Sequence, residues 1–345
     1  TIHWREMANA TRQLVLGIDI GAETIRVLVC EISRDAAIHP IARIEIEHEK
    51  NPAAGLREAL RDVPWGDVVA AAVTGRHARL VNLPRVPVKE AQIHGLRHLR
   101  PDLTSATVVS IGAHGFSALE ARGEGPAVFR ENSRCSQGTG NFLRQLVERF
   151  NLSLDAAATL ADGVKDGAPL SGRCPVILKT DMTHLANKGE DRARIIAGLY
   201  DAVCENVQAL VKPGLSPRDV VLVGGVARAR RVRTRFADFL GRAGMRLVET
   251  DADVNLFLEA FGAAVFAAEK NATASRDRHI EVPSFEALFA ASAPLDLQEL
   301  PPLAASLSRV HRLKAPATAS APAPGTAPAS APASGTATAP AAAPA

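Results

Sequence analysis

The sequence predicts an α/β protein made of two similar halves, each with a mixed sheet, and a cleft between the halves. Two observations support this prediction. Residues 14–32, LVLGIDIGAETIRVLVCEI, have the β-branched content and short apolar runs of two strands joined by a glycine turn. Residues 107–121, TVVSIGAHGFSALEA, repeat the order of strand, Ile-Gly and strand. Alternating helical and strand patterns follow each hairpin, as is typical of α/β folds.

In the first half, we place the turn of the hairpin at residues 21–23. Residues 41–49, IARIEIEHE, alternate apolar and polar side chains and predict the next antiparallel strand. We expect a short helix at residues 56–63 and a buried strand at residues 67–75, DVVAAAVTG.

In the second half, helical periods dominate after the hairpin. The helices are expected at residues 141–150, 175–187, 190–211, 226–240 and 256–269. The apolar run VVLVGG at residues 220–225 predicts one further buried strand that ends in a glycine pair.

These elements divide the chain into two predicted lobes and two following segments. The first lobe spans residues 12–102 and is closed by the helix at 256–270, and the second spans residues 103–255. Residues 271–314 combine scattered apolar residues with several prolines, so we expect an extension that docks loosely. Residues 315–345 contain only Ala, Pro, Thr, Ser and Gly, which predicts a disordered tail because nothing in it can be buried.

The composition limits the classes of function. With 345 residues and a formal net charge of +3, the chain gives no strong case for nucleic-acid binding. We interpret the arginines at residues 227–235 as a solvated helix face rather than a basic patch. No apolar run reaches the ~18–20 residues that span a membrane, and the first residues lack the apolar core of a secretion signal. These features favour a cytoplasmic protein whose four cysteines are not paired in disulfides.

Three glycine turns follow predicted strands and suggest a shared nucleotide site. Asp19 ends the first strand, immediately before the turn at Gly21, where a carboxylate can hold the Mg²⁺ that accompanies phosphates. Gly112 marks the second turn. Gly224 and Gly225 open a helix, the position at which phosphates are commonly bound. An Asp-x-Gly turn alone is structural about as often as functional, so the argument depends on the three together.

Two cysteines lie where helices are predicted to begin. Cys135 precedes the loop SQGTG, and Cys174 precedes Pro175, a residue suited to a first helical turn. The positive end of a helix dipole stabilises a thiolate at such a position. Two thiolates are half of the ligands of an iron–sulfur cluster or of a Cys₄ zinc site, and a two-fold axis would supply the rest. A disulfide and two unrelated reduced cysteines remain as alternatives.

The other two cysteines have a simpler interpretation. Cys30 ends an apolar strand and Cys204 lies within a helical pattern. We expect both to be buried as small hydrophobic side chains.

Taken together, these motifs resemble the BadF/BadG/BcrA/BcrD ATPase family over about residues 14–269. This family includes activators of 2-hydroxyacyl-CoA dehydratases and ATPase subunits of benzoyl-CoA reductases. Besides the first glycine turn, the resemblance comprises RCSQGTGNFLRQL, GRCPVILKTDMTHLANKGE, IIAGLYDAV and VVLVGGVAR. Cys135 and Cys174 are separated by 39 positions, which fits the family pattern.

The resemblance implies a two-lobed actin/hexokinase/Hsp70-type fold of duplicated ribonuclease H-like halves, with ATP and Mg²⁺ between the lobes. It implies a homodimer that shares one [4Fe-4S] cluster, with Cys135 and Cys174 of each subunit as ligands. Residues that would bind nucleotide are Gly21, Thr24, Gly112, Gly138, Thr139, Gly140, Gly224 and Gly225, with Asp19 at the Mg²⁺ and phosphate. The partners implied are an iron–sulfur dehydratase or reductase component and an electron donor of the ferredoxin or flavodoxin type.

Two turns depart from the family pattern. The second phosphate motif of the family usually reads Asp-Ile-Gly-Gly-Gln-Asp, whereas this chain has SIGAHG, with Ser110 and Gly115 at the acidic positions and His114 at the glutamine. We interpret His114 as incidental more readily than as a replacement. In the first turn, Glu23 would repel a phosphate unless Mg²⁺ intervenes, while Arg26 keeps the charge of a common lysine.

The departures leave alternatives to an ATP-hydrolysing electron donor. One is a relative that keeps the iron–sulfur cluster but no longer hydrolyses ATP. Another is a sugar kinase, because this fold hosts several functions. The sequence offers no carboxylate base tied to a sugar site, so the kinase is the weakest of the three.

Overall fold

The computed structural model describes residues 12–33, 35, 37–132, 139–170, 174–273 and 282–289. Its first sheet has the strand order β3-β2-β1-β4. The strands are β1 (Leu14–Ile20), β2 (Thr24–Ile32), β3 (Ile38–Glu47) and β4 (Val68–Thr74). β1 is antiparallel to β2 and parallel to β4, so the sheet is mixed as the sequence predicts.

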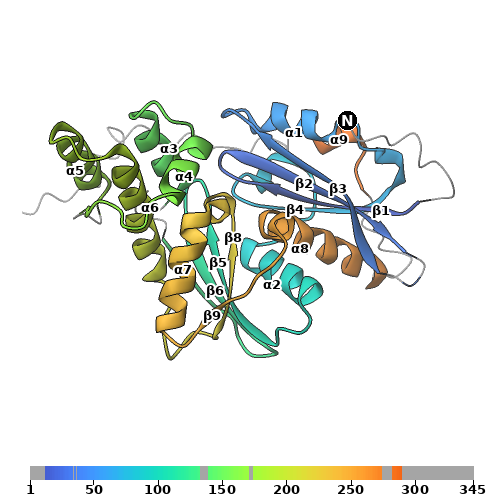
Figure 1. Ribbon diagram of the computed structural model, residues 1–345. Helices are drawn as coiled ribbons and strands as arrows, with labels where there is room; N and C mark the ends of the chain where they lie inside the picture. The colour runs from blue at the N-terminus through green and yellow to red at the C-terminus, as the bar shows by residue number, and fades with distance from the viewer. Residues whose placement is uncertain are drawn as a thin grey trace, which may run out of the picture. The chain divides into compact units, whose positions relative to one another are not determined.

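Helices cover both faces of this sheet (Figure 1). α1 (Pro52–Leu60) and α9 (Phe285–Leu288) pack on the face that carries the even-numbered side chains of β1. α8 (Ala252–Thr273) packs on the opposite face. The approach of α8 requires glycine in the strand, because a Cβ at Gly17 would lie 1.7 Å from the Ala260 carbonyl oxygen.

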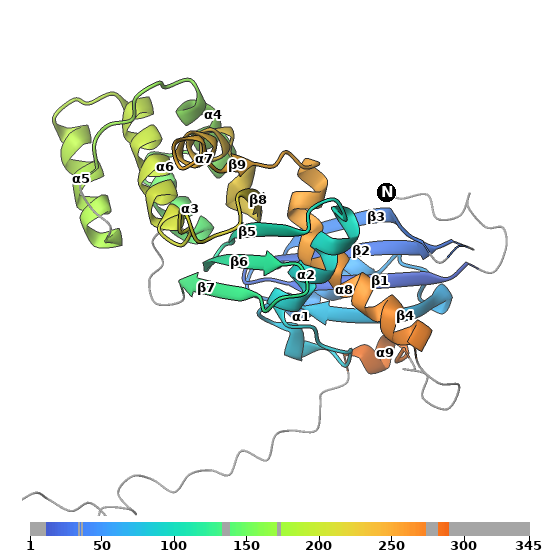
Figure 2. The same cartoon turned by 90° about the horizontal axis from the view of Figure 1, so that it is seen from below.

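The second sheet has the order β7-β6-β5-β8-β9. Its strands are β5 (Ser105–Ile111), β6 (Phe116–Arg122), β7 (Val128–Asn132), β8 (Asp219–Val223) and β9 (Arg246–Leu247). One face carries a large apolar cluster formed with five helices. These helices are α3 (Gly140–Glu148), α4 (Leu154–Asp162), α5 (Pro175–Asn187), α6 (Arg192–Gln208) and α7 (Arg230–Arg242). α5 packs beside α6 (Figure 2) and contributes Leu178 and Met182 to the cluster.

α8 and α2 (Val88–Leu99) form a helix pair that contacts both sheets (Figures 1 and 2). The two helices lie close together because glycines face backbone across the contact. A Cβ at Gly262 would lie 1.7 Å from the Ala91 carbonyl oxygen, and one at Gly95 would lie 2.6 Å from the Leu258 carbonyl oxygen. Leu96 and Leu258 reach the apolar cluster of the second sheet. The packing of α2 against α8 therefore holds α8 in a position where it contacts both sheets.

Both hairpins, the mixed sheets and most of the expected helices agree with the sequence-based prediction. The helix expected at residues 226–240 is an exception at its start, because a 3₁₀ turn, Gly225–Arg228, follows the glycine pair and α7 begins only at Arg230. The sequence did not identify α2, α4 or the edge strands β7 and β9. Within the expected extension, residues 282–289 pack on the first sheet, where Leu288 is fully buried and Trp65 Nε1 donates a 2.9 Å hydrogen bond to the Pro283 carbonyl. The expected tail at residues 315–345 lies outside the described residues. Among the helices of the described segments, none combines the length and apolarity needed to cross a membrane.

The arginines of α7 correct the expectation of a solvated helix face. Arg231 is 5% exposed, and its guanidinium donates to both carboxylate oxygens of Asp201 at 2.7 and 2.8 Å. Arg235 donates to the same carboxylate at 2.8 and 3.0 Å. Part of the arginine cluster is therefore an internal ion-pair network that joins α6 to α7. Arg230, with 84% of its side chain exposed, does face solvent.

A buried carboxylate in the second sheet makes stability depend on pH. Glu120 is fully buried, and burial by itself raises its pKa. Hydrogen bonds from Arg122, Ser216 and Arg130 outweigh this effect and lower the pKa from 4.5 to about 2. The folded state thus holds the proton more weakly than the unfolded state does.

We expect the Glu120→Gln variant to have a flatter acid-stability profile than the wild type. The wild-type contribution, about 3 kcal/mol from the size of the pKa shift, is present above pH 4.5 and is lost as the pH falls through about 2. Urea denaturation between pH 6 and pH 2 measures the difference. Glu124→Gln, at an exposed position, is the matched control, and identical profiles for Glu120→Gln and wild type would contradict the assignment.

Candidate functional site at the junction of the two sheets

The first predicted turn lies where β1 and β2 meet. Asp19 is 9% exposed near the end of β1, and Gly21 follows the strand. The Gly21 N–H donates a 2.9 Å hydrogen bond to the carbonyl of Thr24, the first residue of β2. A Cβ at Gly21 would lie 2.9 Å from that carbonyl oxygen, so this tight turn favours glycine.

The surroundings of Asp19 disfavour its charged form. Burial raises the pKa of Asp19 from 3.8 to about 7, the nearby carboxylate of Glu259 adds to the rise, and Arg26 opposes it. Arg26 Nη1 lies 3.9 Å from Asp19 Oδ2, while Arg26 Nη2 lies closer to Glu45, at 2.9 Å. Arg26 thus interacts with both Glu45 and Asp19, so its positive charge only partly offsets the negative charge of Asp19.

The second turn is connected directly to helix α3. The Gly112 N–H donates to the Gly115 carbonyl at 2.8 Å, which closes the turn between β5 and β6. The Gly112 carbonyl in turn accepts a 2.9 Å hydrogen bond from the N–H of Gly140, the first residue of α3. Thr139 is buried and caps this helix, because its hydroxyl accepts from the Phe142 N–H. A movement of the turn would therefore act on the beginning of α3.

The third turn lies against the second turn and close to Arg26 of β2. Gly224 has a φ of 95°, and a Cβ there would lie 2.5 Å from the carbonyl oxygen of Ile111, next to the second turn. Gly225 begins a 3₁₀ turn, Gly225–Arg228, and a Cβ on it would lie 3.9 Å from Arg26 Nη2 of the first sheet. The Gly224 N–H donates to the Asn255 carbonyl in the first turns of α8. Glycine turns far apart in the sequence therefore come together between the sheets.

A direct link joins the first and second turns. His114 Nε2 donates to Glu23 Oε1 at 2.7 Å, and Lys50 also pairs with that oxygen. The interpretation of His114 as incidental is wrong, since it forms an ion pair or hydrogen bond across the two sheets. Burial raises the pKa of Glu23, but the hydrogen bonds from Lys50 and His114 outweigh burial and lower it. Glu23 therefore carries a negative charge where the phosphates of a nucleotide would be expected.

The cysteines divide as the sequence predicts, as far as the structure describes them. Cys30 and Cys204 are buried, and burial raises the pKa of the Cys30 thiol to about 12 and that of Cys204 still further. Cys174 is exposed and is the N-cap residue of α5. Cys135 and Gly138 lie outside the described residues.

Sequence reasoning missed Glu259, a buried carboxylate in the middle of α8. A signal was present, because Glu259 interrupts the apolar run LFLEAFGAAVFAA. The pattern predicted only a closing helix and did not show what this glutamate contacts.

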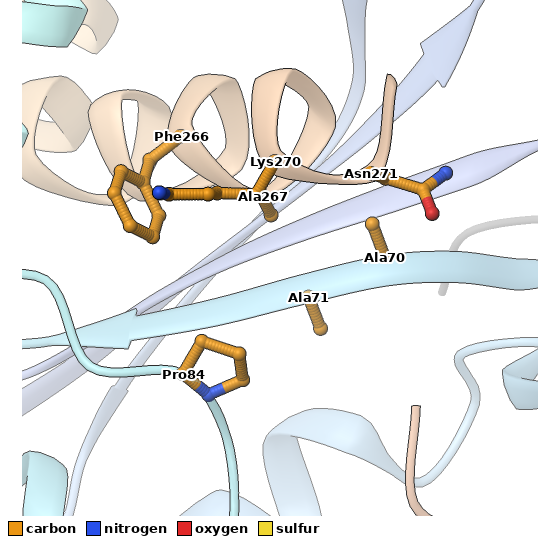
Figure 3. Close-up of a pocket in the computed structure, with 7 residues that line it drawn as sticks. All are labelled: Ala70, Ala71, Pro84, Phe266, Ala267, Lys270 and Asn271. Atoms are coloured by element: carbon orange, nitrogen blue, oxygen red, sulfur yellow. The ribbon is translucent and has the colours of Figure 1, made fainter. Parts of the chain in front are cut away.

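A hollow elsewhere in the molecule does not belong to this site. It lies between β4 and the end of α8 and is lined by Ala70, Ala71, Pro84, Phe266, Ala267, Lys270 and Asn271 (Figure 3). Its single charged group, Lys270, lies 5.6 Å from the centre of the Phe266 ring. Mostly apolar and small side chains give this hollow no evident chemistry.

The two mixed sheets, joined through α8 and carrying glycine turns at their junction, define a two-lobed ATPase fold of the actin and hexokinase type. The chain belongs to the BadF/BadG/BcrA/BcrD ATPase family, whose model matches residues 16–267. It is 26% identical over 218 residues to the activator of lactoyl-CoA dehydratase of Anaerotignum propionicum, covering 62% of this chain and 83% of the relative.

Two solved structures share the fold. Component A of the Acidaminococcus fermentans (R)-2-hydroxyglutaryl-CoA dehydratase is 23% identical, with a TM-score of 0.65 over 74% of this chain and 98% of the other. The activator of the 2-hydroxyisocaproyl-CoA dehydratase from Clostridium difficile, solved with bound ADPNP, is 20% identical, with a TM-score of 0.64 over 74% of this chain and 95% of the other.

Proposed function

We propose that this chain is an ATP-dependent activator that passes low-potential electrons to a 2-hydroxyacyl-CoA dehydratase or a benzoyl-CoA reductase-type partner. The observation that carries the proposal is the position of Cys174. This thiol is exposed at the N-terminus of α5, and the next described side chains, Val176 and Ile177, are 69% and 49% exposed. Aliphatic side chains beside an exposed thiol suit a surface that a second subunit covers.

Cys174 and Cys135 are the residues that would hold a [4Fe-4S] cluster, with the same two residues from the second subunit of a homodimer. The fit is supported by the exposure of Cys174, since a shared ligand must be reachable by both subunits, and by the burial of Cys30 and Cys204, which removes them as competitors. When bound, such a cluster carries one electron.

The three glycine turns are the proposed ATP site. Gly21, Thr24, Gly112, Gly224 and Gly225 would place backbone groups against the nucleotide, and Asp19 would face its Mg²⁺. Thr139 and Gly140, with Gly138 outside the described residues, would transmit the nucleotide state to α3. The hydrogen bond from Gly140 to Gly112 supports this step, because a turn that shifts on binding phosphate pulls on the helix behind Cys135.

The partners in this proposal are an iron–sulfur dehydratase or reductase component and a ferredoxin- or flavodoxin-type electron donor. The names of the relatives support the first of these, as several are dehydratase activators. A cytoplasmic, reducing setting would keep the thiols available for the cluster.

Anaerobic determination of iron and acid-labile sulfide, paired with an ATPase assay, tests the proposal. The protein is expected to be brown and to hold about four iron atoms per dimer. Its rate of ATP turnover is expected to change when a partner that binds it in a nucleotide-dependent way is present. A colourless dimer without iron after anaerobic reconstitution would contradict it.

The link between Glu23 and His114 favours a second candidate, an iron–sulfur relative that does not hydrolyse ATP. A carboxylate held at the first phosphate turn competes with phosphate, and Ser110 and Gly115 carry no charge. The ATPase assay separates the candidates, because measurable turnover without a partner excludes the non-hydrolysing relative.

We expect the Glu23→Gln variant to bind ATP about tenfold more tightly than the wild type. Removing one negative charge from the turn reduces repulsion of the phosphates, and about 1.4 kcal/mol corresponds to this factor. Equilibrium titration with a fluorescent ATP analogue measures the change. Glu47→Gln is the control, since Glu47 is 58% exposed and pairs with Arg144. Unchanged affinity in Glu23→Gln would place the phosphates away from this turn.

A further inference from the structure

Glu259 is a carboxylate on the apolar helix α8, at the junction of the two sheets. It is 8% exposed. The amide nitrogen of Gln92 donates to its Oε1 at 2.8 Å, from α2. The hydroxyl of Ser110 donates to the same oxygen at 3.4 Å, from the end of β5. α8 lies between the sheets (Figures 1 and 2), and its side chains pack in the apolar clusters of both, with Ala260 in that of the first sheet and Leu258 in that of the second.

Asp19 approaches the same place from β1. It lies on the face of the first sheet that α8 covers, and the charges of Asp19 and Glu259 repel each other. Arg26 is 3.9 Å from Asp19 and makes its shorter contact, 2.9 Å, with Glu45. The buried carboxylates of Asp19 and Glu259 therefore lie in the same region, where Arg26 offsets only part of their negative charge. Burying two such charges is unfavourable unless a cation joins them.

Two further oxygens there have no hydrogen-bond partner. Thr74 pairs with Asp19 in the parallel register of β1 and β4, so both side chains point to the same face. The Thr74 hydroxyl is fully buried and unpartnered. Gln92 is also fully buried, and its carbonyl oxygen is unpartnered although its amide nitrogen holds Glu259. Buried polar atoms without a partner commonly indicate a missing ion or water.

We infer that Glu259 and Asp19 together bind a divalent cation of the Mg²⁺ class, and that Glu259 supplies from α8 the negative charge that Ser110 lacks. The two carboxylates, the Thr74 hydroxyl and the Gln92 carbonyl supply oxygen atoms, the ligand atoms that Mg²⁺ prefers. One or two protein carboxylates suffice for Mg²⁺ when water and substrate phosphates complete its shell. The inference rests on the proposed function in placing the nucleotide phosphates at this cation. In this inference Ser110 does not bind the cation, and its hydroxyl positions the Glu259 carboxylate by a hydrogen bond.

A purely structural role for Glu259 makes a different prediction. In that case the glutamate would serve only as an acceptor for Gln92 and Ser110, and a cation would have no effect on it. The two roles differ in what a carboxamide at position 259 changes, because a carboxamide preserves an acceptor but removes the charge.

A titration of the full chain with Mn²⁺, carried out with and without ADP, tests the inference. The EPR signal of the free ion reports how much Mn²⁺ is bound. We expect Glu259→Gln to weaken Mn²⁺ binding at least tenfold, and Asp19→Asn to do the same. The double variant S110D/E259Q moves the carboxylate to the neighbouring strand and should recover most of the lost affinity. Glu269→Gln is the matched control on the same helix, since Glu269 is 57% exposed and should leave binding unchanged.

A second readout uses the melting temperature. The cation-free Glu259→Gln protein should melt higher than the wild type, because repulsion with Asp19 is removed, and its melting temperature should no longer rise with Mg²⁺. Equal Mn²⁺ affinity in Glu259→Gln and wild type, or no Mn²⁺ binding by the wild type, would overturn the inference. Mn²⁺ binding that depends on Glu259 in a protein that takes up neither nucleotide nor iron would reject the proposed function and support the cation site.

Discussion

On the proposed function, the Cys174→Ser variant is expected to lose its iron while keeping its fold. An exposed N-cap residue makes few packing contacts, and serine is a favoured N-cap, so α5 should form normally. A serine hydroxyl does not replace a thiolate as a cluster ligand, and two of the four ligands of a shared site change at once in a homodimer. Iron and sulfide are determined after anaerobic reconstitution. The iron content should fall from about four atoms per dimer in the wild type to near zero in the variant.

Cys30→Ala provides the matched control for this variant. Cys30 is fully buried and packs in the core formed with α8, so alanine should leave the iron content at the wild-type value. Circular dichroism of both variants checks the fold. Wild-type iron content in Cys174→Ser would exclude Cys174 as a ligand and would remove the observation on which the proposed function depends.

The Asp201→Ala variant is expected to lose about 3 kcal/mol of unfolding free energy. Asp201 receives both Arg231 and Arg235, and its removal leaves the buried Arg231 guanidinium without a countercharge. Breaking a buried ion pair in this way costs about 3–5 kcal/mol. The lower end applies because Arg231 retains the carbonyls of Ala161 and Val164 as acceptors. Urea denaturation measures the loss.

Asp219→Ala is the comparison for this variant. Asp219 pairs with Arg246, whose side chain is 71% exposed, and exposed ion pairs contribute about 0–1 kcal/mol. Equal losses in the two variants would show that the network between α6 and α7 is as weak as a surface pair. A larger loss in Asp201→Ala alone supports the internal role of these arginines.

Local patterns predicted much of the fold. The β-branched runs on either side of Gly21 and Gly112 indicated both hairpins, because strand pairing across a short turn depends on nearby residues. The start of α5 at Pro175 followed from the preference of proline for a first helical turn. The burial of Cys30 and Cys204 followed from the apolar residues around them.

Other features depended on contacts between distant segments. α2 was not identified, and its one glycine, Gly95, is explained only by the backbone of α8 against which it packs. Arg231 belongs to a sequence that looks like a solvated helix face, yet Asp201 on another helix draws it inward.

The sequence by itself determined most of the helices and strands and the family, and it predicted the cysteines that suit a cluster, since these depend on local propensity and ordered motifs. The tertiary structure decided which charges meet at the junction of the sheets. It joined Glu23 to His114, and it brought Glu259 to Ser110 and Asp19. Electrostatic interactions act through space between residues that are far apart in the chain, so no local pattern could have predicted these pairs.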